Sequence, residues 1–217
     1  MLLIIVFVFL LLHLYIKKTY FRKQKNIRNV IVMKKNIEVL STVEKKFVLD
    51  KMNNTNKFGG TKLSNGKKIM AKDIDSNITK RLYRYVKQYL SNEPNIFLGE
   101  PFFRLYTDND FISWHYDGNH TKNKKYTFVF LLDKNDCNTS VFEYKDNTTG
   151  EVKSLDMEVN SMIYYEGDKL YHRITSQTKD CYRMVLVCPV HTSTDISLLG
   201  YFEKSLLYVT DKFNIHI

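Results

Sequence analysis

The pattern of hydrophobic and polar residues predicts a domain built mainly from β-strands. From residue 101 onwards, short segments rich in aromatic and β-branched residues alternate with polar, turn-forming segments. The predicted strands are residues 102–107, 111–116, 126–132, 141–145, 151–155, 162–165, 171–175 and 181–190. No long helical pattern interrupts these segments, so we expect an antiparallel jelly roll, also called a double-stranded β-helix.

Helices are predicted on either side of the strands, which makes the expected fold class mainly β (α+β). Residues 77–90 have apolar side chains at helical spacing and follow the potential N-cap residues Asp75 and Ser76. Residues 196–209 are expected to form a second helix that packs back on the domain, although Gly200 weakens that pattern.

The segment before the predicted helix is mixed in pattern. Residues 37–40 and 46–49 have the composition of short strands. The pairs Gly59-Gly60 and Asn65-Gly66 indicate turns between them and the helix.

The N-terminus has a different composition from the rest of the chain. Residues 1–16 are almost entirely Leu, Ile, Val and Phe, and no small-residue cleavage site precedes Lys17. We therefore predict a single-pass membrane anchor at 1–16 and a basic juxtamembrane linker at 17–35, which suits anionic lipid better than nucleic acid. Residues 36–217 would form the globular domain, with its core at about 100–190.

The charge pattern bears on which side of the membrane the domain faces. The 217-residue chain has a formal net charge of +10, and lysines follow the anchor but do not precede it. By the positive-inside rule, the domain is expected in the cytosol. Five Asn-x-Ser/Thr sequons keep a lumenal location open as the alternative, and they begin at Asn53, Asn77, Asn119, Asn138 and Asn147.

The cysteines add little to the choice of compartment. Cys137, Cys181 and Cys188 are an odd number and lack metal-ligand spacing. They are expected to be free thiols in a reducing compartment.

Three residues of the predicted strands have the chemistry of a metal site. His115 and Asp117 are two residues apart, so in a strand their side chains project from one face, about 6–7 Å apart along the backbone. His172, in a later strand, is the best candidate for a third ligand. Two histidines and one carboxylate form the facial triad of non-haem Fe(II) oxygenases. Trp114 and Tyr116 are expected on the opposite face, in a packing role.

Arg183 lies eleven residues after His172, in a strand that is otherwise apolar. A buried guanidinium is costly unless an anion pairs with it. A bound dicarboxylate near the metal would supply that anion, because the planar fork of arginine fits a carboxylate. A structural ion pair with an internal Asp or Glu is the alternative.

Together these residues resemble a known enzyme family. The triad and Arg183 are accompanied by matching segments at 103–106, 127–132, 138–142 and 159–162. The whole set resembles the Fe(II)- and 2-oxoglutarate-dependent dioxygenases, especially their prolyl-4-hydroxylase-like branch, over about residues 100–190. Two features depart from that branch. The glycines of its Gly-Gly-x-Thr segment are missing here, and the collagen-type enzymes usually carry lysine at the position of Arg183.

The resemblance implies a role for each residue of the site. His115, Asp117 and His172 would bind Fe(II), and Arg183 would hold the distal carboxylate of 2-oxoglutarate. Tyr106 and Thr127 would direct hydroxyl groups to the same carboxylate. The co-substrates would be 2-oxoglutarate and O2, with ascorbate in support.

The expected reaction is hydroxylation of a C–H bond with release of succinate and CO2. The resemblance favours a protein or peptide side chain as substrate, with proline first. One alternative is an AlkB-like nucleic-acid demethylase, which the positive charge and the lysines at 122, 124 and 125 favour. The other is a non-catalytic jelly-roll binding module. The oligomeric state stays open.

Overall fold

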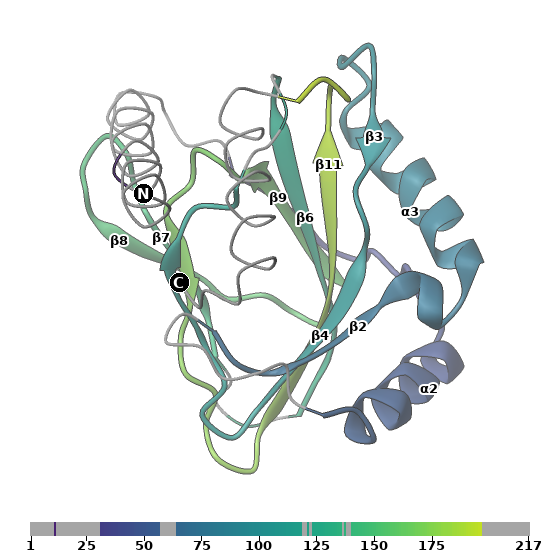
Figure 1. Cartoon of the computed structure of the whole chain (residues 1–217). Coiled ribbons are helices and arrows are strands. Elements are labelled where there is room, and N and C mark those ends of the chain that lie inside the picture. The colour runs from purple at the N-terminus through teal and green to yellow at the C-terminus, as the bar shows by residue number, and fades with distance from the viewer. Residues whose placement is uncertain are drawn as a thin grey trace, which may run out of the picture.

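The computed structural model describes Leu11 and residues 31–56, 64–118, 121, 123–135, 137 and 140–196. Within these ranges, two antiparallel β-sheets face each other, and two α-helices cover the outer side of the larger sheet (Figure 1). The predicted jelly roll is therefore confirmed as a mainly β, two-sheet fold.

The larger sheet has the strand order β1-β9-β6-β11-β4-β2, and β3 pairs with the end of β11. Its strands are β1 (Ile31–Lys34), β2 (Lys67–Met70), β3 (Phe97–Leu98), β4 (Phe102–Thr107), β6 (Lys125–Lys134), β9 (Ser161–Glu166) and β11 (Tyr182–His191). The smaller sheet has the order β5-β10-β7-β8. Its strands are β5 (Ile112–His115), β7 (Phe142–Lys145), β8 (Val152–Leu155) and β10 (His172–Ile174).

The helical elements precede most of the strands. They are α2 (Thr42–Asn53), the short 3-10 helix η1 (Ala71–Asp73) and α3 (Ser76–Tyr89). The helix expected at 77–90 is confirmed as α3, and Asp75 caps it by accepting a hydrogen bond from the Asn77 amide at 2.8 Å. The helix expected at 196–209 lies outside the described residues, apart from Ile196, which bridges to Thr121.

The two short strands expected near residue 40 are wrong. Residues 37–40 form no strand, and residues 46–49 lie within α2. The cause is a capping box that starts a helix at this point, since Ser41 Oγ accepts from the Glu44 amide and the Glu44 carboxylate accepts from the Ser41 amide. Glu44 also accepts a hydrogen bond from Arg81 of α3 at 2.7 Å, which ties the two helices together.

Strand β1 corrects the predicted boundary between linker and domain. Its residues pair with β9 from Ile31↔Tyr165 to Lys34↔Met162, so the end of the predicted 17–35 linker belongs to the larger sheet. The linker was predicted from its charge, which conceals the short apolar run at 30–33. No helix in the described ranges is long and apolar enough to cross a membrane. The anchor predicted at 1–16 lies outside those ranges, Leu11 excepted.

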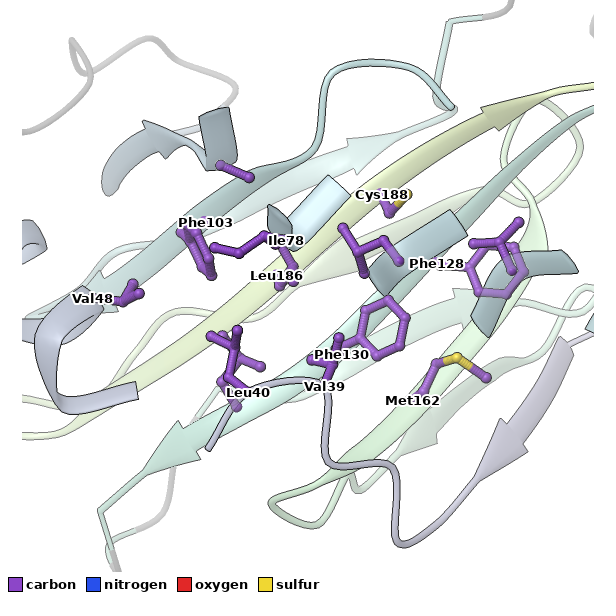
Figure 2. Packing of buried hydrophobic residues seen from close by; sticks show 14 of the residues in the cluster. Val39, Leu40, Val48, Ile78, Phe103, Phe128, Phe130, Met162, Leu186 and Cys188 are labelled. Atoms are coloured by element: carbon purple, nitrogen blue, oxygen red, sulfur yellow. The ribbon is translucent and has the colours of Figure 1, made fainter. Parts of the chain in front are cut away.

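Alternation along the strands of the larger sheet divides the buried residues between two faces. One face packs against α2 and α3, and Figure 2 shows Phe103, Phe130 and Leu186 in this core. The other face turns toward the smaller sheet and carries Tyr106, Val129 and Val185. Residues two apart on β4, β6 and β11 therefore line a common space between the sheets.

The structure contradicts the prediction of free cysteines for two of the three residues. Cys137 and Cys181 form a disulfide with a Cα–Cα distance of 6.1 Å, which is ordinary for such a bond. The two lie 44 residues apart in sequence, and the ends of β6 and β11 bring them together. Cys188 is buried and free.

The ion pair between the helices makes stability depend on pH. Hydrogen bonding to Arg81 lowers the pKa of Glu44 from 4.5 to about 2. Because the folded-state pKa is the lower one, ionised Glu44 stabilises the fold above pH 4.5, and this contribution disappears as the pH falls to about 2. Both side chains are about one third exposed, so solvent screening keeps the effect small.

We expect Glu44→Gln to lower the free energy of unfolding by roughly 0.5–1 kcal/mol at pH 7. The difference from the wild type should shrink as the pH falls from 4.5 to about 2, as measured by urea unfolding of the full chain. Glu38→Gln, at an exposed position near the same helices, is the matched control. A difference that stays constant over this pH range would contradict the assignment.

Candidate metal centre

The structure brings the three predicted metal ligands together. His115 ends β5, Asp117 follows it, and His172 begins β10, where it lies directly opposite His115 in the antiparallel pair. One ligand atom from each residue lies within 4.8 Å of the other two. Asp117 Oδ1 is 3.5 Å from His115 Nε2 and 3.8 Å from His172 Nε2.

Hydrogen bonds to the backbone fix the tautomer of both histidines. The Nδ1 atom of His115 lies 2.8 Å from the Ser113 carbonyl, and that of His172 lies 2.9 Å from the Leu170 carbonyl. A carbonyl only accepts, so Nδ1 carries the proton and Nε2 keeps its lone pair. Burial lowers the pKa of His172 to about 4, although nearby Asp117 opposes this shift. His172 is therefore neutral at pH 7, as a metal ligand must be.

Asp117 is held as an ionised carboxylate. Burial raises its pKa, but interactions with His172, His115 and Lys125 outweigh that effect and hold the pKa below its usual range. Its amide donates to the Gly167 carbonyl at 2.9 Å, which fixes the backbone just after β5.

Thr127 contacts the metal centre in a way that the sequence did not predict. Its side chain lines the same cavity, but its hydroxyl donates to Asp117 Oδ2. The structure thus uses this hydroxyl to orient a predicted metal ligand. The role predicted for Thr127, toward the carboxylate of 2-oxoglutarate, stays a prediction.

Gly167 is a residue of the site that sequence reasoning missed. A Cβ atom at this position would lie 2.6 Å from Thr127 Oγ1 and 2.7 Å from Asp117 Oδ2, closer than real Cβ atoms approach. Only glycine leaves room for the Thr127–Asp117 hydrogen bond here. The sequence does show a glycine five residues before His172, but by itself this glycine indicates only a turn.

A cavity of about 100 Å³ extends from the metal ligands between the two sheets. Its walls come mainly from β4, β5, β6, β9, β10 and β11. It is lined by Phe102, Arg104, Tyr106, Ile112, His115, Asp117, Thr127, Val129, Phe142, Tyr165, His172, Ile174, Arg183, Val185 and Val187.

Arg183 lines this cavity and is only 2% exposed. Its Nη1 donates to the Ser140 carbonyl at 3.4 Å, and its Nη2 lies 3.5 Å from Met157 Sδ. Burial lowers the pKa of its guanidinium, but arginine stays charged in proteins. No carboxylate in the described part of the chain forms an ion pair with Arg183, so the alternative of a structural ion pair gains no support there.

Two buried tyrosines lie near Arg183. Tyr106 pairs with it across β4 and β11, as expected for a residue of the same site. Tyr165 on β9 was missed, although the alternation of β9 places it on the inner face with Ile163. Its hydroxyl is 3.2 Å from His172 Nε2. Burial raises the pKa of both phenols, so both stay neutral hydrogen-bond donors at pH 7.

Trp114 and Tyr116 lie away from the cavity, as predicted. Both rings pack on Tyr171, with centroid distances of 5.3 Å and 4.9 Å. They support, from its outer face, the strand that ends at His115.

No protein-family model matches the sequence, and no curated protein sequence matches it. Solved structures with the same fold are, however, readily found. An oxidoreductase of the 2OG-Fe(II) oxygenase family from Burkholderia pseudomallei has a TM-score of 0.58 and 12% identity, over 83% of this chain and 92% of its own.

A prolyl hydroxylase from Trichoplax adhaerens, in complex with a peptide of hypoxia inducible factor, has a TM-score of 0.57 and 13% identity, over 84% of this chain and 92% of its own. The non-haem α-ketoglutarate-dependent epimerase SnoN from nogalamycin biosynthesis has a TM-score of 0.60 and 11% identity, over 76% and 78%. At these identities the likeness is one of fold. The chain has the fold of the 2-oxoglutarate- and Fe(II)-dependent oxygenases, as its sequence predicted.

The contact between Thr127 and Asp117 predicts the behaviour of two variants. Thr127→Val keeps the shape of the side chain but removes the hydroxyl, and Gly167→Ala places a methyl group against both residues. Each should weaken binding of Mn(II), a stand-in for Fe(II), by about tenfold. Titration calorimetry of the full chain measures this affinity, and thermal unfolding checks the fold.

Thr127→Ser retains the hydroxyl and is the matched control. Its Mn(II) affinity should stay close to that of the wild type. If Thr127→Val bound Mn(II) as tightly as Thr127→Ser, the hydroxyl would have no part in orienting Asp117.

Proposed function

We propose that this chain is an Fe(II)- and 2-oxoglutarate-dependent dioxygenase that hydroxylates a C–H bond and releases succinate and CO2. One observation carries the proposal. The cavity has a triad of metal-ligating side chains at one part of its wall and a buried arginine without a carboxylate partner at another, among the residues described. A dicarboxylic co-substrate would satisfy both.

The donor set fits Fe(II). One ligand atom each from His115, Asp117 and His172 lies within 4.8 Å of the other two, and all three residues line the cavity. Two imidazoles and one carboxylate suit iron better than they suit magnesium or calcium, because those two metals prefer ligand sets made only of oxygen atoms. Bound iron would supply the oxidising chemistry with O2. The protein holds the His172 imidazole neutral and the Asp117 carboxylate ionised.

The far part of the cavity suits the distal carboxylate of 2-oxoglutarate. The guanidinium of Arg183 would pair with it, and the neutral hydroxyl of Tyr106 would donate to it. The Tyr165 hydroxyl, 3.2 Å from His172 Nε2, lies at the metal end of the cavity. Apolar walls formed by Val129, Val185 and other residues exclude water, which strengthens these interactions.

A protein or peptide side chain is the proposed substrate, with proline first. The Trichoplax prolyl hydroxylase that shares this fold is complexed with a peptide, which supports a peptide substrate. The epimerase SnoN shares the fold as well, so the fold by itself does not choose between substrates.

A nucleic-acid substrate has less support. Of the three lysines that favoured it, two are engaged within the protein, because Lys124 pairs with Glu93 at 2.8 Å and Lys125 donates to the Gly118 carbonyl at 2.5 Å. Lys122 lies outside the described residues. The non-catalytic alternative would fit a site that had lost a ligand or the arginine, and here all four residues line one cavity.

We also propose that the domain is tethered to a membrane through residues 1–16. The charge pattern favours a cytosolic domain. The Cys137–Cys181 disulfide instead favours the lumenal alternative, because disulfides persist in oxidising compartments. The five sequons also favour a lumenal domain, so we propose the lumenal orientation.

The full chain with Fe(II), ascorbate and 2-oxoglutarate is expected to form succinate slowly without substrate. Arg183→Met should weaken 2-oxoglutarate binding by about 100-fold, because the carboxylate loses its charged partner, and should leave Mn(II) binding intact. His115→Ala should abolish succinate formation. Titration calorimetry and succinate assays provide the two readouts.

Arg84→Met, an exposed position on α3, is the matched control and should behave as the wild type. A folded wild-type protein that binds Mn(II) but not 2-oxoglutarate would exclude the proposed activity and favour a binding module.

A further inference from the structure

A second arginine, Arg104, lines the same cavity. It lies on β4, two residues before Tyr106, so both side chains project from the inner face of the strand. In the sheet, Arg104 lies opposite Val185 of β11 on one side and Lys68 of β2 on the other. Two positively charged residues, Arg104 and Lys68, are therefore neighbours on β4 and β2, and of the two Arg104 lines the cavity.

The hydrogen-bonding capacity of Arg104 is largely unused. Its Nη2 donates to the Asn65 carbonyl at 3.2 Å, and its guanidinium lies 5.4 Å from the centre of the Tyr106 ring. Its Nε is buried and has no hydrogen-bond partner. A guanidinium offers five N–H donors, and no carboxylate in the described ranges pairs with this one.

The neighbour of Arg104 on β2 is a second basic residue, Lys68. Lys68 Nζ lies 4.2 Å from the centre of the Phe102 ring, and Phe102 lines the cavity. Burial lowers the pKa of Lys68, and the positive charge of Arg104 lowers it further. Glu100 raises the pKa of Lys68, so a carboxylate of the protein already acts on this lysine, whereas none pairs with Arg104 in the described ranges.

The proposed co-substrate does not supply this anion. Of its two carboxylates, one is assigned to Arg183 and the other to the metal. Arg104 lies on the β4 wall, one inward-facing position along from Tyr106, and reaches the segment of Asn65 beside β5. It is thus placed for a group that enters next to the co-substrate.

We propose that Arg104 binds a carboxylate of the substrate, so that the preferred substrate is a peptide with Asp or Glu next to the oxidised residue. This inference rests on the proposed function and adds that the substrate carries a negative charge next to the oxidised residue. A single, partly buried arginine on a cavity wall suits one carboxylate, whereas nucleic-acid backbones require an extended basic surface. The exposed Lys72 nearby pairs with Glu100 at 2.7 Å.

Two peptide libraries test the proposal. Both are acetylated and amidated and have randomised flanking positions, and one has Glu at the centre where the other has Gln. The full chain with Fe(II) and 2-oxoglutarate is assayed for succinate formation and for peptides heavier by one oxygen. The Glu library should stimulate turnover about tenfold more than the Gln library, and Arg104→Gln should remove that preference.

Further measurements separate this inference from the proposed function. Arg104→Gln should bind Mn(II) and 2-oxoglutarate as the wild type does. Arg104→Lys, which keeps the charge, should retain part of the preference for Glu and guards against a variant that does not fold. Arg84→Gln on the exposed side of α3 is the matched control and should keep the full preference.

Three results would overturn the inference and leave the proposed function intact, provided that the wild type binds 2-oxoglutarate. These are a Glu preference that survives in Arg104→Gln, a loss of 2-oxoglutarate affinity in that variant, or no stimulation by either library. Stimulation by single-stranded DNA alone would replace the peptide with a nucleic acid. Arg104-dependent stimulation by free amino acids alone would overturn the peptide as the source of the carboxylate.

Discussion

The antiparallel pairing of β5 with β10 is the interaction on which the rest of the site depends. It places His172 directly opposite His115, so the strand pairing itself brings together two ligands from distant parts of the chain. Asp117 reaches the same point because its amide is bound to the carbonyl of Gly167. The hydrogen bonds on the three ligands complete the arrangement, because the Ser113 and Leu170 carbonyls set the tautomers and Thr127 orients the carboxylate.

Buried positive charge is the second constraint on the cavity. Removing a guanidinium from water is unfavourable by several kcal/mol, so a fold tolerates one only if an anion completes it. Arg183 and Arg104 both line the cavity, and neither has an ion pair among the described residues. Among the described residues, β4 and β11 therefore carry two arginines that bound anions would complete. Two arginines on two walls imply two separate anionic groups.

The sequence predicted the parts of this molecule that depend on local periodicity. Period-2 alternation located β4 to β11, and one strand could display His115 and Asp117 together. The sequence did not predict α2, because its residues have a strand-like composition and the helix starts from the Ser41–Glu44 capping box. The sequence also did not predict three contacts between distant segments. These are the contact of Tyr165 with His172, the close approach of Gly167 to Thr127, and the disulfide between Cys137 and Cys181. Such contacts follow from sheet order, which alternation does not encode.

The disulfide has a topological consequence for the metal ligands. It closes a covalent ring that contains β7 to β10, and hence His172, while His115 and Asp117 lie outside it. Closing a ring of this length restricts the unfolded chain by about 4 kcal/mol. In an unfolded chain that keeps the disulfide, the segment with the third ligand therefore samples fewer conformations before it pairs with β5. Any ion held by all three residues would join the ring to the chain outside it as a second cross-link, made by coordination.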